Sequence, residues 1–339
     1  MQQLVLDGPG ALHWEDVAEP VATGAGCVVR PIAVATCDLD VGVLRGRFPL
    51  AGPYPFGHEG VAEVVSIGDE VRAVAVGDRV VVPFQISCGE CVPCRRGRTG
   101  NCASHAPMST FGLGAMGGLA WGGLLADLVL VPHADAMLVP LPAGIDPVAV
   151  ASASDNIPDA FRAVGPQLAA EPGAEVLVVG GTGGPPSIGL YAAGLAVALG
   201  AARVVYVDDD PDRLEIAVGL GAEAVEDPTR RKVGAFPITV HAGGNEQHLR
   251  CALNSTAFDG MCTSVSVLID DPALPMFQMY SRCCTLHTGR AHARPHIPAV
   301  LGLVADGRFD PTLITSRVVD WGQAAEALSD PPMKLVVAR

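Results

Sequence analysis

The sequence predicts an α/β protein with two domains: a Rossmann-type, doubly wound parallel sheet and a barrel-like, mostly β domain. Two observations lead to this prediction. Residues 1–150 contain short valine-rich segments separated by glycine turns, which indicates strands joined by tight connections. From Gly173 onward, continuous apolar segments alternate with helix-like segments, which is typical of a parallel sheet covered by helices. A length of 339 residues leaves room for about two such domains.

The β prediction rests on the turns of the first 150 residues. The segment LVLDGPGALHWEDV predicts a hairpin around Gly8-Pro9-Gly10. The segment EGVAEVVSIGDEVRAVAVGDRVVVPF predicts a series of short strands, with GDE and GDR at the turns. Together these segments predict a compact, barrel-like β domain.

The parallel sheet is predicted from the second half of the chain. The strand AEVLVVG is followed by a glycine-rich turn, the helix IGLYAAGLAVALG and the strand ARVVYVD. The alternation continues with DPDRLEIAVGLGA (helix), ITVHAG (strand), QHLRCALNST (helix) and GMCTSVSVLI (strand). The tail from about residue 290 adds the helix IPAVLGLVADG and the strand MKLVVAR. We therefore expect the α/β domain at 157–288 and the β domain at 1–156 and 289–339.

Composition narrows the class of protein. Hydrophobic residues make up 49% of the chain and charged residues 17%, so a large core is expected. The net charge of -14 argues against nucleic acid or an anionic membrane surface as a partner. No signal peptide is visible, and Gly194, Gly200 and Arg203 interrupt the apolar stretch from Leu190, which argues against a membrane span. These features fit a soluble cytoplasmic protein.

Four of the ten cysteines are close together in CGECVPCRRGRTGNC. The spacing C-x2-C-x2-C-x7-C lets tight turns present four sulfurs to one point, as a structural zinc ion requires. An iron–sulfur cluster and four free buried cysteines are the alternatives. Because four protein ligands leave no open position, we expect a structural zinc in a lobe of about residues 86–104. The predicted ligands are Cys88, Cys91, Cys94 and Cys102.

This lobe and its surroundings resemble the zinc-containing medium-chain alcohol dehydrogenases. The similarity covers nearly the whole chain and includes LVLDGPGALHWEDV, the turn at Cys37, GHEGVAEVV, the GD turns, the cysteine lobe and the closing MKLVVAR. The resemblance implies a GroES-like catalytic β domain together with a Rossmann domain that binds NAD. It also implies a homodimer or homotetramer that transfers hydride between NAD and a small alcohol or carbonyl substrate.

The resemblance implies a second metal site. Cys37 follows an apolar strand-like segment, and His58 lies in the turn PFGHEGV, followed by Glu59; alone, either ligand would more often be a buried structural residue. A catalytic zinc needs three protein ligands and one open position, where it acts as a Lewis acid. In the resembled family the third ligand is a cysteine or an acid at the domain junction, which points to Asp155; its alternative role is to cap the following helix. Glu59 would support the site or exchange as a ligand.

Two positions near Cys37 depart from the resembled family. Members with a proton relay carry Ser or Thr two residues after the cysteine and often His a few residues later, whereas this chain has Leu39 and Gly42. Asp40 matches the acid that the family places three residues after the cysteine, where it supports the ligand. A proton must therefore leave through water, Glu59, Asp38 or Thr36, or the reaction is not ordinary alcohol oxidation.

The segment VLVVGGTGGPPSIGLYAAG is a candidate dinucleotide-binding loop. It follows a strand and opens a helix, where glycines allow a tight turn and a close approach to a pyrophosphate. Its spacing is not a strict G-x-G-x-x-G, and Pro185-Pro186 lengthen the loop. The predicted contacts in this loop and helix are Gly180, Gly181, Thr182, Gly183, Gly184, Ile188 and Gly189.

Acidic residues after the next strand favour NAD over NADP. Asp208 ends that strand, at the position where an acid binds the ribose hydroxyls of NAD. The run DDDPDR would repel a 2′-phosphate, and Arg213 is the nearby base that either contacts the cofactor or lies at the surface. A solvated helix start is the structural alternative for these acids.

Three other features are not assigned to a site. The motif HARPH places His292 and His296 four residues apart, as in a metal pair, but its prolines argue against a continuous helix. Cys283 and Cys284 lie in a strand-like segment and are expected to pack in the core. His241 follows an apolar strand, where it either faces the nicotinamide or makes a structural hydrogen bond.

The primary hypothesis is a zinc- and NAD-dependent dehydrogenase of an alcohol or aldehyde, with two zinc ions per chain. A biosynthetic carbonyl or imine reductase on the same scaffold is the second, because the relay residues are missing. The third is a nucleotide- and zinc-binding protein without turnover, against which the intact ligand set argues. The sequence leaves open the substrate, the direction of the reaction and the choice between dimer and tetramer.

Overall fold

The computed structural model describes residues 1–50, 52–114, 120–226 and 231–339. Within these ranges the chain forms two compact units. The first, the β unit, comprises Met1–Pro158, Ala291–Asp306 and Thr315–Arg339, and the second, the α/β unit, comprises Asp159–Arg290 and Gly307–Ile314. The first unit is mostly β and the second has a parallel sheet with helices, so the predicted fold class is confirmed.

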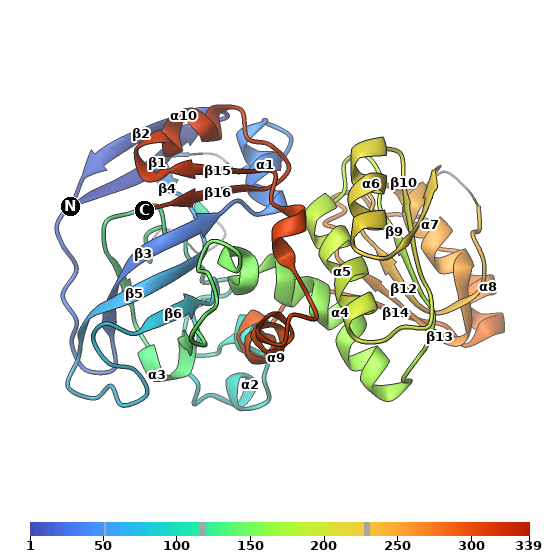
Figure 1. The fold of residues 1–339 in the computed structure, drawn as a ribbon, viewed down its shortest axis with the longest axis horizontal. Coiled ribbons are helices and arrows are strands. Elements are labelled where there is room, and N and C mark those ends of the chain that lie inside the picture. Colours follow the sequence, from blue (N-terminus) through green and yellow to red (C-terminus); the bar gives the residue numbers. More distant parts are fainter. Residues whose placement is uncertain (51, 115–119, 227–230) are drawn as a thin grey trace. The chain divides into compact units, whose positions relative to one another are not determined.

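The β unit contains two sheets and several short helices (Figure 1). Its strands are β1 (Gln2–Gly8), β2 (Ala11–Asp16), β3 (Cys27–Ala35), β4 (Tyr54–Pro55), β5 (Glu59–Ile67), β6 (Arg79–Val82), β7 (Val129–Val131), β8 (Val139–Pro140), β15 (Arg317–Asp320) and β16 (Leu335–Ala338). Its helices are α1 (Asp38–Leu44), α2 (Val92–Arg95), α3 (Ala134–Met137), α9 (Ala293–Ala305) and α10 (Ala324–Ser329).

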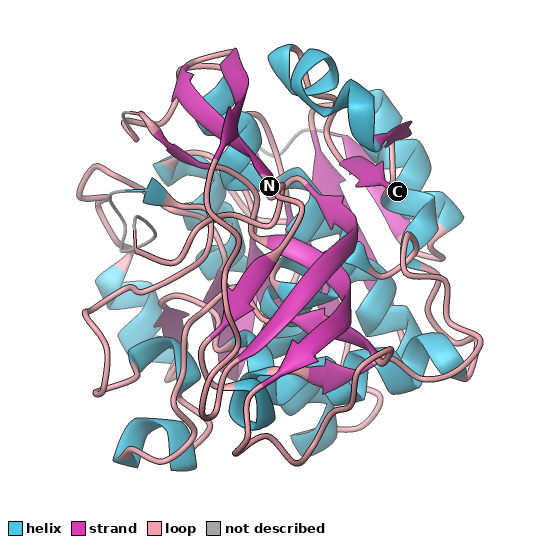
Figure 2. Ribbon diagram, turned by 90° about the vertical axis from the view of Figure 1, so that its left-hand side faces the viewer, coloured by secondary structure: helices cyan, strands magenta, loops and turns pink. Residues whose placement is uncertain are grey.

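The main sheet of the β unit has the order β15-β16-β3-β5-β6-β8, with β7 also paired to β3. Strands of this unit face the viewer in Figure 2. β3 and β5 run antiparallel with Ala35 opposite Glu59, so the turn after β3 lies beside the turn before β5. β16 also runs antiparallel to β3, with Val336 opposite Ala35. The turns after β3, before β5 and before β16 therefore meet at one end of the sheet.

The α/β unit is a parallel sheet with helices between its strands. The strands are β9 (Val176–Val179), β10 (Val204–Asp208), β11 (Glu223–Glu226), β12 (Phe236–His241), β13 (Thr256–Ser264) and β14 (Thr285–Thr288). The helices are α4 (Asn156–Ala170), which begins in the β unit, α5 (Pro186–Ala198), α6 (Pro211–Gly219), α7 (Glu246–Ser255) and α8 (Met276–Arg282). The strand order is β11-β10-β9-β12-β13-β14, and the order along the chain reverses between β9 and β12. Doubly wound sheets bind ligands at this switch point, outside the carboxyl ends of the strands.

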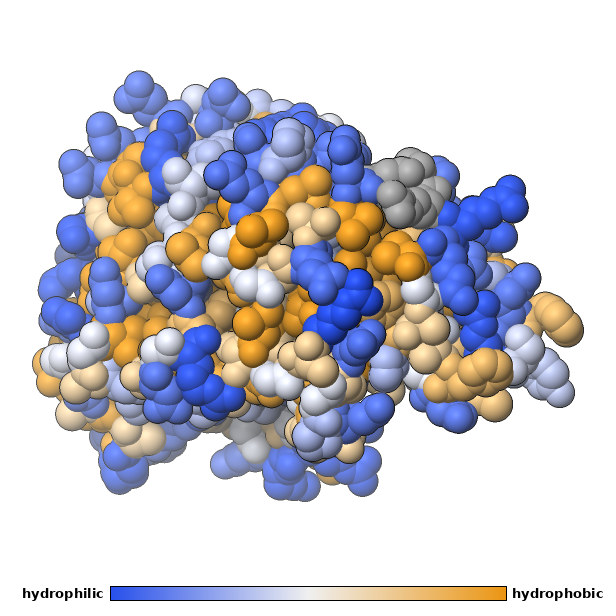
Figure 3. All heavy atoms as spheres, turned by 45° about the vertical axis from the view of Figure 1, so that its right-hand side comes forward, coloured by the Kyte–Doolittle hydropathy of each residue, from blue (hydrophilic) through white to orange (hydrophobic). Residues whose placement is uncertain are grey.

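The apolar stretch from Leu190 is divided between two elements of this unit. It forms most of α5, a turn at Gly200 with φ of +84°, and β10. α5 is apolar almost all round because it is almost entirely buried. None of the described helices is long and apolar enough to cross a membrane. The molecular face in Figure 3 nevertheless intersperses hydrophobic with hydrophilic side chains, as expected when 49% of the residues are hydrophobic.

Two local predictions were wrong. α9 continues through Pro295 and Pro298, because Pro295 lies in the first turn, where no amide donor is needed, and the buried Ile297, Val300 and Leu301 hold the helix in place. Cys283 is not in a strand: it ends α8 with φ of +56° and is exposed.

Candidate active site

The thiols of the four lobe cysteines lie close to one point. All four Sγ atoms are within 4.8 Å of one another, and the Sγ atoms of Cys91 and Cys102 are 3.9 Å apart. Sulfurs bound tetrahedrally at about 2.3 Å from a zinc lie about 3.8 Å apart. The arrangement therefore fits a zinc ion with four thiolate ligands and no open position.

Hydrogen bonds favour the thiolates of Cys88 and Cys91, whereas burial raises the pKa of Cys94 to about 12. Cys88 Sγ accepts from the backbone N–H of Cys91 at 3.4 Å and from the Ser104 hydroxyl at 3.2 Å. Cys91 Sγ accepts from the backbone N–H of Ala103 at 3.3 Å. Burial raises the pKa of Cys88, but the hydrogen bonds from Ser104 and Cys91 lower it by more, to about 6. A cysteine with this pKa is ready to bind a metal near neutral pH.

A second cluster in the β unit consists of Cys37, His58, Glu59 and Asp155. All four are buried, and one ligand atom of each lies within 4.8 Å of those of the others. Cys37 follows β3 and His58 precedes β5, so the antiparallel register of these strands places them side by side. The structure thus brings together the residues that the sequence suggested for catalytic zinc.

Asp155 reaches this cluster from a different part of the chain. It follows a 3-10 helix, Ala151–Ser154, and directly precedes α4. The Ser154 hydroxyl accepts a hydrogen bond from the backbone N–H of Gly60 at 2.7 Å. This bond ties the segment before Asp155 to β5, and so to His58.

In the absence of a metal ion the cluster disfavours ionisation of the Cys37 thiol and the Glu59 carboxyl. Burial raises the pKa of the Cys37 thiol well above its usual range, and the carboxyls of Asp155, Glu59 and Asp40 raise it further. Burial likewise raises the pKa of Glu59, and although Lys334 lowers it, the result is about 8. A divalent metal ion would favour the deprotonated forms of both residues.

His58 gives a second indication that the cluster fits a metal. It is fully buried, yet neither ring nitrogen makes a hydrogen bond to any residue in the described ranges. Its Nε2 lies 3.3 Å from Asp155 Oδ2, and its Nδ1 lies 3.5 Å from Asp40 Oδ1. Metal-binding histidines commonly place one nitrogen on the metal and the other near a carboxylate, and this arrangement fits that pattern.

Asp40 contacts both Cys37 and His58. Cys37 is the N-cap of α1: its backbone N–H donates to Asp40 Oδ2 at 3.0 Å, and its Sγ accepts from the backbone N–H of Leu39 at 3.4 Å. The other oxygen of Asp40 faces the His58 ring. Asp40 can therefore orient two candidate ligands at once.

Leu39 and Gly42, which replace the relay residues of the resembled family, both face hydrophobic side chains in the structure. Leu39 packs against an apolar cluster of Phe84, Leu113 and Ala293. A Cβ at Gly42 would lie 3.8 Å from Phe48 Cβ, so this position also faces a hydrophobic side chain.

Sequence reasoning missed two buried residues of this cluster, Lys334 and Asn156. Lys334 Nζ lies 2.8 Å from Asn156 Oδ1 and 3.5 Å from Glu59 Oε2, and it also donates to the backbone oxygen of Thr36. A lysine next to the apolar run of MKLVVAR is a signal that could have pointed to Lys334. Asn156 has no such signal, because an asparagine at a helix start is ordinary.

The glycine-rich loop connects β9 to α5 at the carboxyl end of the parallel sheet. A Cβ at Gly184 would lie only 2.0 Å from the backbone oxygen of Ala242, so this loop approaches the loop after β12 at a distance that only glycine permits. Gly189, in the first turns of α5, approaches the same residue, and the neighbouring Ile188 is buried. The loop and the start of α5 thus lie where a pyrophosphate would bind.

Asp208 is fully buried beneath this loop. Its carboxylate accepts hydrogen bonds from the backbone N–H of Gly181 at 3.2 Å and from the Tyr206 hydroxyl at 2.8 Å. It also pairs with the guanidinium of Arg213. The structure therefore brings together three predicted cofactor contacts, Gly181, Asp208 and Arg213. The binding of ribose by Asp208 stays a prediction.

Asp209 is more accessible than Asp208. Its side chain is 37% exposed, and it accepts hydrogen bonds from the backbone N–H and the hydroxyl of Thr182 at 3.1 and 2.7 Å. Thr182 belongs to the predicted cofactor loop. Asp209 is thus a further candidate for contact with the cofactor. It lies in the acidic run DDDPDR, but it was not singled out from the sequence.

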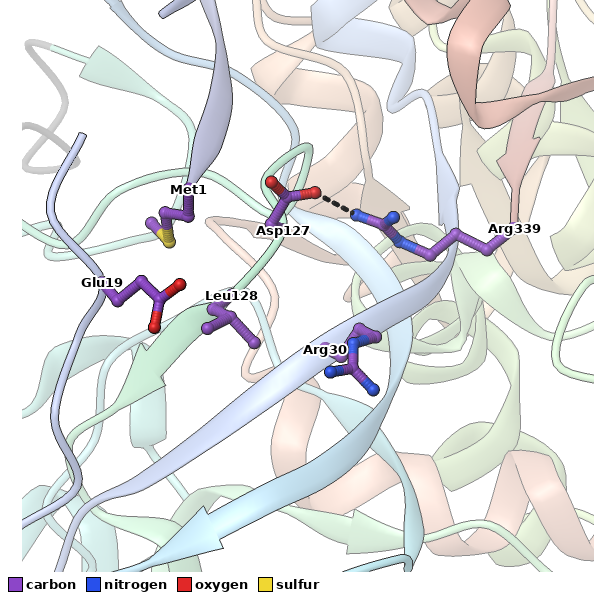
Figure 4. Close-up of a pocket in the computed structure, with 6 residues that line it drawn as sticks. All are labelled: Met1, Glu19, Arg30, Asp127, Leu128 and Arg339. Carbon is purple, nitrogen blue, oxygen red and sulfur yellow. Dashed lines mark hydrogen bonds and ion pairs between the residues drawn. The ribbon is translucent and has the colours of Figure 1, made fainter. Parts of the chain in front are cut away.

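A surface hollow of about 240 Å³ lies elsewhere in the β unit (Figure 4). Arg339 and Asp127, which line part of it, pair with each other at 3.0 Å. None of its lining residues belongs to either candidate metal cluster, so we assign it no part in the chemistry. The lining residues are Met1, Glu19, Arg30, Asp127, Leu128 and Arg339.

Comparisons with known proteins agree with this geometry. Residues 25–143 match the alcohol dehydrogenase GroES-like domain. The chain is 30% identical over 335 residues to the probable zinc-binding alcohol dehydrogenase Rv1895 of Mycobacterium tuberculosis, across 96% of this chain and 84% of that protein. It is 31% identical over 274 residues to glutathione-independent formaldehyde dehydrogenase of Pseudomonas aeruginosa, across 76% of this chain and 65% of that protein.

A solved structure is similar along the full length of the chain. Alcohol dehydrogenase TADH from Thermus sp. ATN1 superposes with a TM-score of 0.86 at 27% identity, covering 100% of this chain and 99% of that one. Because this match includes both units, the likeness extends beyond the β unit.

Proposed function

Because the chain belongs to the zinc-containing medium-chain alcohol dehydrogenase family, we propose that it transfers hydride between an alcohol or aldehyde and NAD with a catalytic zinc. The observation that carries this proposal is the buried cluster of Cys37, His58, Glu59 and Asp155. A thiol, an imidazole and two carboxyls within 4.8 Å of one another are the donor types that zinc takes in catalytic sites.

We assign Cys37, His58 and Asp155 as ligands of the catalytic zinc, with Glu59 as a supporting or exchangeable acid. The four lobe cysteines, Cys88, Cys91, Cys94 and Cys102, would hold a second, structural zinc. A zinc ion with an open position supplies a Lewis acid for the substrate oxygen.

The side chains around the catalytic cluster would orient the ligands. Asp40 holds the backbone of Cys37 and faces the His58 ring. Leu39 places an apolar side chain where a proton-carrying group would otherwise stand. We therefore assign the path of the alcohol proton to water or to Glu59.

The cofactor is assigned to the carboxyl end of the parallel sheet. The glycine-rich loop and the start of α5 would hold the pyrophosphate. The consecutive carboxyls of Asp208, Asp209 and Asp210 favour NAD, because they would repel the 2′-phosphate of NADP. Since protein donors already engage Asp208, Asp209 is a second candidate for the ribose hydroxyls.

A biosynthetic carbonyl or imine reductase is the second candidate function. Leu39 and Gly42 keep it open, because some members of the resembled family that lack the relay are reductases of this kind; the proton for the reduced product would then come from water or Glu59. A nucleotide- and zinc-binding protein without turnover is less supported, because the candidate ligand set is complete.

Other assignments rest mainly on the family and the composition. We propose a catalytic domain at 1–156 and 289–339 and an NAD-binding domain at 157–288. We also propose a homodimer or homotetramer in the cytoplasm, without nucleic acid or membrane partners.

The function is tested by zinc content and turnover together. Purified protein should contain two zinc ions per chain and form NADH from an alcohol at neutral to alkaline pH. Cys37→Ser should lose one zinc and lower kcat/KM by about 100-fold or more, because a metal ligand is removed. Cys27→Ser makes the same change in β3, outside the cluster, and should retain both properties.

The outcomes separate the candidates. One zinc in the wild-type protein, or unchanged zinc content and turnover in Cys37→Ser, would rule out the catalytic assignment. NADH consumption with bulky carbonyls but no alcohol oxidation would favour the reductase.

A further inference from the structure

Asn156 is a buried amide that contacts two of the proposed zinc ligands. It is the first residue of α4 and is fully buried. Its Nδ2 donates to Cys37 Sγ at 3.1 Å and to Asp155 Oδ2 at 3.4 Å. One amide group therefore joins a ligand that follows β3 to a ligand that precedes α4.

The charge of Lys334 determines which end of the amide faces the ligands. Asn156 Oδ1 accepts from Lys334 Nζ at 2.8 Å. If the amide were turned over, its oxygen would face the thiolate and its N–H groups would face the ammonium, and both contacts would be repulsive. The N–H groups must therefore point to Cys37 and Asp155.

Lys334 is itself fixed independently of α4. It is fully buried, lies just before β16, and donates to the backbone oxygen of Thr36, the residue before Cys37. The pairing of β16 with β3 holds both segments in register. The orientation of Asn156 is thus imposed by the sheet that also carries Cys37.

We propose that Asn156 is a positioning residue for the catalytic zinc: its amide holds Cys37 and Asp155 in place and withdraws charge from the sulfur. This inference rests on the proposed function. Hydrogen bonds to charged acceptors are stronger than those between neutral groups, and partners of metal ligands control both ligand orientation and metal affinity. The residue acts through Cys37 and Asp155 and need not touch the substrate.

Asn156→Leu tests the proposal, because leucine has nearly the same size but no donor. Zinc affinity of the catalytic site, measured by competition with a chelator, should fall by about 10- to 100-fold. In protein loaded with Co²⁺, the charge-transfer absorption from the Cys37 thiolate should move to longer wavelength, because sulfur without the hydrogen bond gives up an electron more easily. The Cys37 contribution is isolated by subtracting the spectrum of Cys37→Ser, in which the lobe cysteines remain.

A double-mutant cycle with Lys334→Met tests the role of the lysine. Lys334→Met alone should shift the same absorption, because the amide is no longer held in one orientation. In the Asn156→Leu background it should add a smaller shift, because only the direct effect of the Lys334 charge on Cys37 then remains. Asn254→Leu, the same change in α7 of the α/β unit, should affect neither zinc affinity nor the spectrum.

The results distinguish this inference from the proposed function. An unchanged far-ultraviolet circular dichroism spectrum shows that a variant is folded. If the wild-type protein binds two zinc ions but Asn156→Leu keeps its affinity within twofold and its spectrum unchanged, the role of Asn156 is refuted and the proposed function stands. If the wild-type catalytic site binds no zinc, the proposed function itself fails.

Discussion

His241 shows how burial sets the charge of a single residue in the α/β unit. It ends β12, is fully buried, and its Nδ1 lies 2.9 Å from the Ser264 hydroxyl oxygen. Burial, together with the nearby His248, lowers the pKa of His241 to about 3. The imidazole is therefore neutral in the folded protein over the whole physiological range.

This lowered pKa predicts a loss of stability in mild acid. In the unfolded chain the imidazole takes up a proton near pH 6.5, so acid favours the unfolded state. When the pH falls from 7.5 to 5.5, His241 should lower the free energy of unfolding by about 1.4 kcal/mol. His241→Asn can keep a bond to Ser264, but asparagine does not titrate. Denaturant unfolding at the two pH values should therefore show that the variant loses about 1.4 kcal/mol less unfolding free energy in acid than the wild-type protein does. Equal acid sensitivity in both proteins would contradict the assignment.

At the scale of elements, the cysteine lobe depends on its metal more than on regular structure. Between residues 86 and 104 the structure has only the four-residue helix α2 and a short 3-10 helix, Thr99–Asn101. Small segments of this kind derive much of their folding free energy from a bound zinc. Arg95, Arg96 and Arg98 are exposed here, so loss of order would open them to trypsin.

Cys94→Ser should therefore remove one zinc and increase the rate of tryptic cleavage in the lobe by about tenfold or more. Cys94 is the most buried of the four lobe cysteines, so its loss should disturb the lobe strongly. Cys283→Ser, at the exposed end of α8, is the control. Mass spectrometry of the fragments locates the cuts, and an unchanged cleavage pattern in Cys94→Ser would exclude a zinc-supported lobe.

The elements also explain which features the sequence could predict. The cysteine lobe was predictable because its ligands lie within fifteen residues of one another. Cys37, His58 and Asp155 were named through a family resemblance, since nothing local connects residues so far apart. Lys334 was missed because the register of β16 on β3 brings it to the cluster. The course of α9 was misjudged because a buried apolar face outweighs the cost of Pro298.

At the scale of the whole molecule, zinc and the nucleotide are assigned to different units. Both candidate metal clusters lie in the β unit, and the glycine-rich loop lies in the α/β unit. All three tryptophans, Trp14, Trp121 and Trp321, belong to the β unit, so their fluorescence follows that unit alone.

This division predicts different responses to the two ligands. A zinc chelator should lower the unfolding midpoint seen by tryptophan fluorescence, because it removes the bound zinc ions that stabilise the β unit. NAD at 100 times its Kd should stabilise the α/β unit by about 2.7 kcal/mol and raise the midpoint seen mainly by circular dichroism. If both ligands shift both signals equally, the two units unfold as one.

The interrupted β unit has a consequence for biosynthesis. Cys37, His58 and Asp155 are synthesised before the α/β unit, whereas Lys334 is synthesised after it. A nascent chain that has emerged only as far as Asp155 therefore holds the acids and the thiol without the lysine that partly balances their charge. The excess negative charge of this set would itself attract a metal ion, and the site reaches its final balance of charge only after translation has passed the whole α/β unit and β16 has paired with β3.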